Sequence, residues 1–459
     1  MTEANKKDYR VGNDGFWARA WVTPLVLAVV GGLLAVFTAG PERLGYAYLF
    51  GLFVTSTFML GGLFLVLIQY LTAAHWGVSS RRIAEVVMSG APVVALLAVP
   101  FIAGVALGKI DIYQEWQSVA AHAGHAGHDD SSSDSEPEHG GQDEHGMLEI
   151  GASVAHAQDH GDSHGSEAHE DGHSHTPQET ALHHEILEQK TGYLNTLGWS
   201  ARALVYVSIW SLIAWAYFAW SRKQDEDRDP KHTLRMQSLA APMLIVFGLS
   251  LTFAGFDWLM SLEAAWFSTI FGVIIFAGSA IAILATTILI GLSFYKRGLT
   301  GDAINPVHFH DLAKLMFGFV CFWTYVSFSQ WMLIWYAGIP EEATWYHRRW
   351  EGGWQFVAYL LIFGHFVAPF VLLISRVQKL NLRWLQVMCF WVILMHVIDI
   401  YWFVLPQAGG FSISPADIGA LLFVGGVFFT YVFWQLGRVP LVPVGDPRLP
   451  KSLHHHQTH

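Results

Sequence analysis

Ten long apolar runs constrain this chain more than any other feature of its sequence. Each run can cross a bilayer as a helix, because about 20 apolar residues at about 1.5 Å per residue span the roughly 30 Å hydrocarbon core. The runs are continuously apolar and do not alternate, so they do not fit a β-barrel. We therefore expect an all-α integral membrane protein with ten transmembrane helices, and not a soluble enzyme. The runs lie near residues 21–38, 44–71, 86–107, 198–220, 238–261, 267–295, 310–338, 352–375, 382–404 and 415–436.

The loops between the runs differ in charge. Most of the 26 Lys and Arg residues lie in the two terminal segments and in the loops on the same side of the membrane as those segments. The positive-inside rule then places both termini in the cytoplasm. The first twenty residues are polar and show no signal-peptide pattern, so we expect the first run to act as an uncleaved anchor.

An unusual insertion separates the third run from the fourth. It carries more than half of the 24 histidines, together with many Asp, Glu, Ser and Gly residues. Because it has too few apolar residues to bury a core, we expect it to be disordered on the periplasmic side. Five parts are then expected: a cytoplasmic tail (1–20), spans one to three (21–107), the insertion (108–197), spans four to ten (198–436) and a second cytoplasmic tail (437–459).

Histidines close to carboxylates give the insertion a weak metal-binding hypothesis. Such side chains can bind Zn²⁺, Cu²⁺ or Ni²⁺. The alternative is a hydrophilic insertion with adventitious metal affinity. The candidate ligands are His122, His125, His128, His173 and His175.

The stretch from 307 to 350 combines ionisable residues with an apolar helix. His310 and Lys314 are four residues apart, and Asp311 and Lys314 are three apart, so all three can share one helix face. A polar stripe through a membrane helix must face protein or water and not lipid. The stripe continues at helical spacing through Gly318, Cys321, Tyr325 and Ser329.

Five further ionisable residues lie within the runs or at their edges. Inserting such groups costs about 2.5–3.5 kcal/mol each, so a functional role is the default hypothesis. The alternative is a polar cluster that only ties helices together. One of the five can also form an interfacial pair with Arg81 or Arg82; this residue is Glu85. The other four are Asp257, His365, and the pair His396 and Asp399, which are three apart and share a face.

Two membrane aspartates indicate how the helices are grouped. Asp257 and Asp399 lie at similar depths in the fifth and ninth runs. Runs two to five and runs six to nine then form two comparable units, each closing with an aspartate. We expect two four-helix bundles with the first and tenth helices at the periphery. This internal repeat is weak, because it rests on the placement of ionisable residues and not on clear identity.

The two cysteines exclude several redox cofactors. Cys321 and Cys389 both fall inside runs, and the chain has no clustered cysteine motif. We therefore expect no covalently attached haem and no iron–sulfur cluster in this chain. The membrane histidines are too few for the four ligands of a dihaem cytochrome b. A bound quinone or lipid stays open.

Three blocks of sequence resemble a known membrane protein family. They are LGYAYLFGLFVTSTFMLGGLFLVLIQYLTAAHW, FDWLMSLEAAWFSTIFG and HDLAKLMFGFVCFWTYVSFSQWMLIWYAGIPEEATWYHRRW. The blocks are similar to the F subunit (ActF) of bacterial alternative complex III, a quinol:cytochrome c (or other electron acceptor) oxidoreductase. The similarity covers about residues 20–436 without the insertion, which departs from the family's pattern.

The resemblance implies a fold, a location and partners. The fold is that of the NrfD/PsrC-like membrane proteins, and the location is the bacterial inner membrane. The implied partners are a homologous quinol-binding C subunit, an iron–sulfur protein, multihaem and monohaem c-type cytochromes, small membrane subunits and membrane lipid, with no nucleic acid. The resemblance also implies a subunit without its own redox centre, with proton conduction as an expected role.

The leading functional hypothesis is therefore a structural and proton-conducting subunit of such a complex. Acids, histidines and lysines spaced by hydroxyls and water can pass protons. The cytoplasmic half of the path would use Glu85, His310, Asp311 and Lys314. The periplasmic half would use Asp257, His396 and Asp399, with His365 near the join and Tyr325 and Ser329 as bridges.

Two other classes of function stay open. A quinol-oxidising NrfD-like subunit would need a base beside an apolar slot, and Asp257 or the His396–Asp399 pair could serve. A secondary transporter would fit the paired bundles, but the sequence shows no matched helix breaks for a midplane substrate site.

Overall fold

A computed structural model describes residues 9–12, 14–120 and 177–454 of the 459-residue chain. Within these ranges ten helical segments are long and apolar enough to cross a membrane. This confirms the all-α multi-pass membrane fold. The five histidines of the metal hypothesis (His122, His125, His128, His173 and His175) lie outside the described residues, as does most of the expected insertion.

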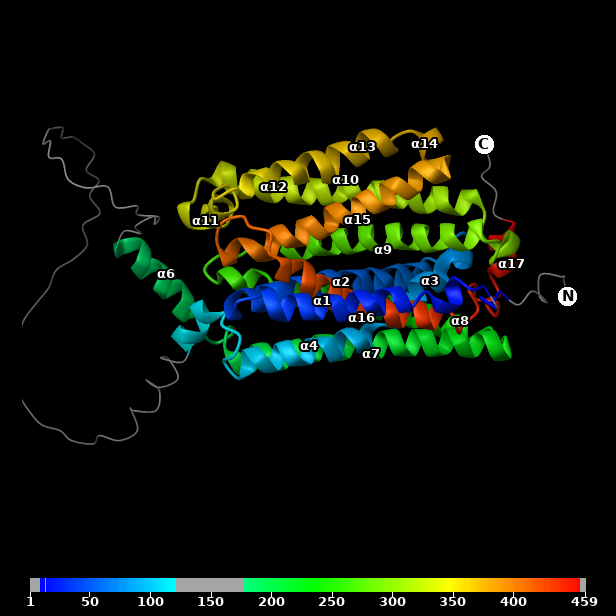
Figure 1. Ribbon diagram of the computed structural model, residues 1–459, viewed down its shortest axis with the longest axis horizontal. Helices are drawn as coiled ribbons and strands as arrows, with labels where there is room; N and C mark the ends of the chain where they lie inside the picture. Colours follow the sequence, from blue (N-terminus) through cyan, green and yellow to red (C-terminus); the bar gives the residue numbers. More distant parts are fainter. Residues whose placement is uncertain (1–8, 13, 121–176, 455–459) are drawn as a thin grey trace, which may run out of the picture.

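The transmembrane elements run side by side along one long axis (Figure 1). The third span is built from two helices, and the eighth contains a π-helical segment between two α-helical pieces. The elements are α1 (Val22–Thr38), α2 (Pro41–Leu71), α3 (Val78–Met88) with α4 (Ala91–Ala106), α7 (Thr196–Asp227), α8 (Lys231–Trp258), α9 (Phe271–Lys296), α10 (Pro306–Ala337), α12 (Trp354–Leu360) with the π-helix Leu361–Val367 and α13 (Ala368–Leu373), α15 (Leu382–Val404) and α16 (Pro415–Leu436).

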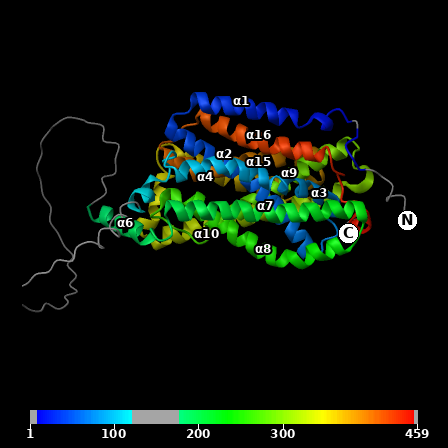
Figure 2. The same ribbon diagram turned by 90° about the horizontal axis from the view of Figure 1, so that it is seen from below.

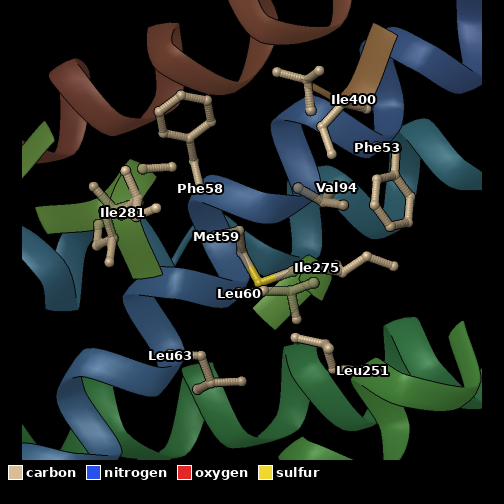
Figure 3. Close-up of a cluster of buried hydrophobic side chains, with 14 of the residues drawn as sticks. Phe53, Phe58, Met59, Leu60, Leu63, Val94, Leu251, Ile275, Ile281 and Ile400 are labelled. Atoms are coloured by element: carbon tan, nitrogen blue, oxygen red, sulfur yellow. The ribbon is translucent and has the colours of Figure 1, made fainter. Parts of the chain in front are cut away.

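Helices α2 and α9 form the centre of the molecule. Both are apolar all round and almost entirely buried, as expected for helices that have no lipid or water face. They approach closely because Gly61 lies against α9, where a Cβ atom would come within 2.1 Å of the Ser279 carbonyl oxygen. Figure 3 shows Met59 and Leu63 of α2 beside Ile275 of α9 in this core.

The other spans surround this pair. Helix α2 contacts α3, α4 and α8, while α10 and α15 pack on α9. Helices α1 and α16 lie together along one edge of the array in Figure 2, and α16 packs against α2. The peripheral position expected for the first and tenth spans stays a prediction, because α16 also contacts α2, α3 and α4. The division into two four-helix bundles stays a prediction, because α9 contacts both α2 and α8.

Short elements close both ends of the helix array. Helix α17 (Leu449–Leu453) folds back on α3, and Ser452 bonds Ser79 there with an oxygen–oxygen distance of 2.8 Å. At the other end lie α11 (Pro340–Arg348) and α6 (Pro177–Lys190). Helix α6 lies within the range expected to be disordered. It is ordered there because Leu187 is buried and Lys190 donates to the Ala264 carbonyl at 2.6 Å.

Candidate functional site

Glu85 sits in a fully buried ionic arrangement in the second half of α3. Arg81 and Arg82 lie one turn earlier, and their guanidinium nitrogens approach the two carboxylate oxygens of Glu85 at 2.8 and 3.0 Å. The Ser221 hydroxyl also donates to Glu85, at 2.8 Å. All three charged side chains are inaccessible to solvent. Glu85 is thus ion-paired with both arginines, as the alternative interpretation of this residue proposed.

These three residues belong to a six-residue set that we call the arginine network. Arg81 also contacts Asp446 at 2.5 Å, and Arg448 contacts Asp446 at 2.8 Å. Arg82 pairs with Asp225 of α7. Three cations and three carboxylates balance one another, so the network carries no net charge. Its members are Arg81, Arg82, Glu85, Asp225, Asp446 and Arg448.

Asp446 lies on the segment after α16, beyond the membrane-spanning helices. Burial alone would raise its pKa, but Arg81 and Arg448 outweigh burial and hold the pKa well below its usual range. Asp446 is therefore a stable anion that fastens the C-terminal segment to α3. A proton moving through Glu85 would have to break several such pairs, which argues for a structural role of this network.

The next set of predicted residues opens α10. Lys314 Nζ lies 2.7 Å from Asp311 Oδ1, and His310 Nδ1 lies 3.6 Å from the same oxygen. The predicted pairing of Lys314 with Asp311 is confirmed. The expectation that Lys314 is shielded from lipid stays a prediction, and its side chain is 52% exposed. The reason is its depth: it lies only eight residues, or about 12 Å, from the first residue of α10.

Asp257 near the end of α8 is buried and fully paired. Arg202 of α7 reaches both of its carboxylate oxygens at 2.9 Å, and the Tyr206 hydroxyl donates at 2.7 Å. Such a two-pronged pair fixes the orientation of the carboxylate. Sequence reasoning identified Asp257 but not Arg202. The signal was present, because Arg202 is the one arginine well inside the fourth apolar run.

The remaining three candidates meet near the middle of the helices. The His396 Nε2 atom lies 2.8 Å from the Thr57 hydroxyl of α2. The indole of Trp323 on α10 donates to Asp399 Oδ2 at 3.0 Å. The same indole stacks on the His365 ring, with centroids 4.1 Å apart and planes 20° apart. We call these five residues the interior cluster: Thr57, Trp323, His365, His396 and Asp399.

The interior cluster contains buried polar atoms without hydrogen-bond partners. In the described part of the chain these are both ring nitrogens of His365, the Nδ1 atom of His396 and the Oδ1 atom of Asp399. The three side chains are at most 2% exposed. An unpaired buried polar group costs about 1–3 kcal/mol, and native proteins rarely keep several together without a functional reason.

Two local features of the chain make room for this cluster. His365 lies in the π-helical segment, and such segments occur often at functional sites. On α9, Gly278 faces the cluster, where a Cβ atom would come within 2.8 Å of the His396 ring and 4.0 Å of Asp399. A side chain at position 278 would therefore displace His396.

The stripe beyond Lys314 on α10 faces outward, which corrects an expectation. Tyr325 is 67% exposed, and the Ser329 hydroxyl donates to the Tyr325 carbonyl of its own helix at 2.7 Å. The buried face of α10 instead carries Val320, Trp323 and Val326. The stripe had been expected to face protein or water and to bridge the proton path, but bulky apolar and aromatic residues fill the interior on the opposite face. Tyr325 and Ser329 therefore cannot bridge the interior cluster.

An ion pair that the sequence did not reveal closes the end opposite to the arginine network. Arg349 after α11 is buried, and its Nη1 atom lies 3.3 Å from Glu263. Gln407 donates to the same Glu263 oxygen at 2.8 Å, and Arg349 also donates to the Trp345 carbonyl at 3.0 Å. These bonds join three loops, so the pair stabilises that end of the helix array.

No protein-family model matches this chain, and the search of curated proteins finds no match either. Among the described residues, no group of three or more His, Cys, Asp or Glu side chains is arranged to hold a metal ion. The interior cluster is therefore the candidate functional site on its own geometry.

Proposed function

From the interior cluster we propose that this chain is the proton-conducting membrane subunit of a quinol:electron acceptor oxidoreductase of the alternative complex III type. It would carry no redox centre of its own and would lie in a bacterial inner membrane with both termini in the cytoplasm. The observation that carries the proposal is the presence of three buried titratable side chains with unpaired atoms near the middle of the spans. The resemblance of the α2 and α10 sequences to the F subunit of that complex supplies the enzyme class.

The chemistry of the cluster suits proton transfer. A neutral imidazole holds a proton on one nitrogen and can accept one on the other, so it passes protons without a net change. Asp399 Oδ1 and His396 Nδ1 are both available to exchange a proton, while Trp323 and Thr57 hold the other atom of each residue. His365 is stacked on the same indole and extends the cluster towards the eighth span.

The outer ends of the path differ from those expected. Asp257 and Glu85 each form an ion pair with arginine, so in the proposed function both have a structural role and do not carry protons. The pair of Asp311 and Lys314 stays the candidate entry from the end that bears α17, because Lys314 is half exposed there.

Coupled turnover tests the proposal. The complex is purified through a tag on this chain and placed in liposomes, and quinol oxidation and proton release are measured together. Asp399→Asn should leave assembly and electron transfer near the wild-type level and lower the number of protons moved per electron. The double variant Asp257→Asn with Arg202→Met is the matched control, since it removes a buried acid together with the cation that pairs with it. Normal proton movement in Asp399→Asn would contradict the proposal.

The proteins that co-purify test the assignment to a complex. Iron–sulfur and c-type cytochrome subunits should accompany the chain, together with a homologous quinol-binding subunit. A chain that purifies alone and moves a solute across liposomes would instead favour the secondary-transporter alternative.

A further inference from the structure

A cavity lies between the peripheral pair of helices and the rest of the molecule. It has a volume of about 230 Å³ and is bounded by α1, α2, α15 and α16. Its wall is apolar apart from the Thr55 hydroxyl, which is already bonded to the Gly51 carbonyl of its own helix at 2.8 Å. The wall includes Leu27, Val54, Val397, Leu421 and Phe429.

Two consecutive glycines on α16 show how the cavity forms. A Cβ atom on Gly426 would lie 2.6 Å from the Pro24 carbonyl oxygen, so this glycine lets α16 touch α1. A Cβ atom on Gly425 would meet only Thr55, at 3.8 Å. Position 425 thus faces open space that the neighbouring contact does not fill.

Two arginines lie where α1 and α16 continue past the cavity on the same side: Arg19 precedes the lining residue Pro24 by five residues, and Arg438 follows the lining residue Phe429 by nine. The backbone at Trp17 meets the end of α16, where the Cβ position of Gly437 is 3.9 Å from the Trp17 carbonyl oxygen. Arg19 lies two residues after Trp17 and Arg438 one residue after Gly437, and both side chains are exposed. Arg438 stacks on Trp434, which fixes its guanidinium against the outside of α16.

We propose that this place binds one anionic phospholipid. An acyl chain occupies the apolar cavity, and the phosphate lies at Arg19 and Arg438. Basic residues where helices emerge from a membrane bind anionic head groups. A quinone ring would need hydrogen-bond donors for its carbonyl oxygens, and the one hydroxyl of the wall, on Thr55, already bonds within its own helix, so the cavity suits part of an acyl chain and not a quinone ring.

The position of Phe58 relates this lipid to the interior cluster. The Phe58 ring borders the cavity and contacts Phe429, with ring centroids 5.6 Å apart. Its other neighbour is His396, at 6.2 Å. Figure 3 shows Phe58 of α2 among the buried apolar side chains of the core. The bound chain would therefore complete an apolar wall that keeps water from His396 on this side, independently of whether the cluster conducts protons.

Lipid retention tests the site. The full chain in its purified assembly is washed in detergent, exchanged into nanodiscs of phosphatidylglycerol or phosphatidylcholine, and extracted for quantification of bound lipid. Gly425→Leu fills the cavity and should lower retained phosphatidylglycerol at least about tenfold, which corresponds to about 1.4 kcal/mol. Gly248→Leu is the matched control, because position 248 is also helical and open but lies on α8, away from the cavity.

A second variant, Arg19→Gln together with Arg438→Gln, tests binding of the lipid head group. Both side chains are exposed, so these substitutions leave the core intact. This variant should lose its preference for phosphatidylglycerol over phosphatidylcholine. Equal retention by Gly425→Leu and wild type would overturn the proposal, as would recovery of a quinone in place of the phospholipid. An unchanged head-group preference in the arginine variant would overturn it as well.

Discussion

Trp323 and Asp399 come from different helices, and the indole nitrogen of Trp323 lies 3.0 Å from one oxygen of Asp399. The same Trp323 indole also contacts a second residue, because the His365 ring stacks on its face. One residue therefore holds the orientation of both a buried acid and a buried histidine. The interior cluster depends on Trp323 although that side chain does not itself titrate.

The hydrogen bond to Asp399 can be removed without removing the ring. Trp323→Phe should keep an aromatic face against His365 and leave a buried carboxyl oxygen without its donor. We expect a stability loss of about 1–3 kcal/mol, measured as a lower unfolding temperature of the purified protein. Trp331→Phe on the exposed face of the same helix should change little. Equal losses in both variants would show that the hydrogen bond contributes nothing specific.

The glycine opposite His396 provides a second test. Gly278→Ala places a methyl group within 2.8 Å of the His396 ring in a fully packed interior, so the ring must shift away from Thr57. We expect a cost of about 1–3 kcal/mol, as for overpacking in other cores, together with slower proton movement. Gly248→Ala meets nothing within 4 Å. It should be neutral or stabilise the protein by up to about 1 kcal/mol, because alanine favours a helix. A stable Gly278→Ala protein with normal proton movement would contradict this account.

Local spacing predicted what depends on local geometry. The apolar runs predicted all ten spans, and the three-residue separation of Asp311 and Lys314 predicted their contact. Contacts between distant parts of the chain were not predictable in this way. Arg81 and its partner Asp446 are 365 residues apart, and Arg202 and Asp257 are 55 apart. Periodicity specifies a helix face but not which neighbour covers it.

The outward stripe of α10 shows the same limit. Both faces of that helix have helical periodicity, and polarity suggested the wrong one as the inner face. Trp323 was missed because aromatic side chains occur throughout these spans, so nothing in the sequence distinguishes a tryptophan that donates a hydrogen bond from one that only packs.

Asp446 should make stability depend on pH in the acid range. Its carboxyl pKa is low in the folded protein and about 3.9 in the unfolded chain. The unfolded state therefore takes up a proton first as the pH falls. The stability that Asp446 contributes is complete above about pH 5 and is lost progressively below that value. The unfolding temperature should fall more steeply from about pH 5 to pH 3 in wild type than in Asp446→Asn, whereas the exposed Asp111→Asn should follow wild type. Parallel curves for wild type and Asp446→Asn would mean that this pair does not govern acid stability.

The pairing of Asp257 with Arg202 predicts a difference between single and double variants. Asp257→Asn leaves the Arg202 cation beside a neutral amide in a largely buried place. Breaking such a pair costs about 3 kcal/mol, the low end of the usual range, because the Arg202 side chain is still 25% exposed. The double variant Asp257→Asn with Arg202→Met leaves no buried charge without a partner. It should therefore be more stable than Asp257→Asn alone. Unfolding temperatures of the wild type, both single variants and the double variant give the coupling free energy of the pair. Coupling close to zero would mean that Asp257 is not fastened by Arg202, and Asp257 would then return to the list of candidate proton carriers.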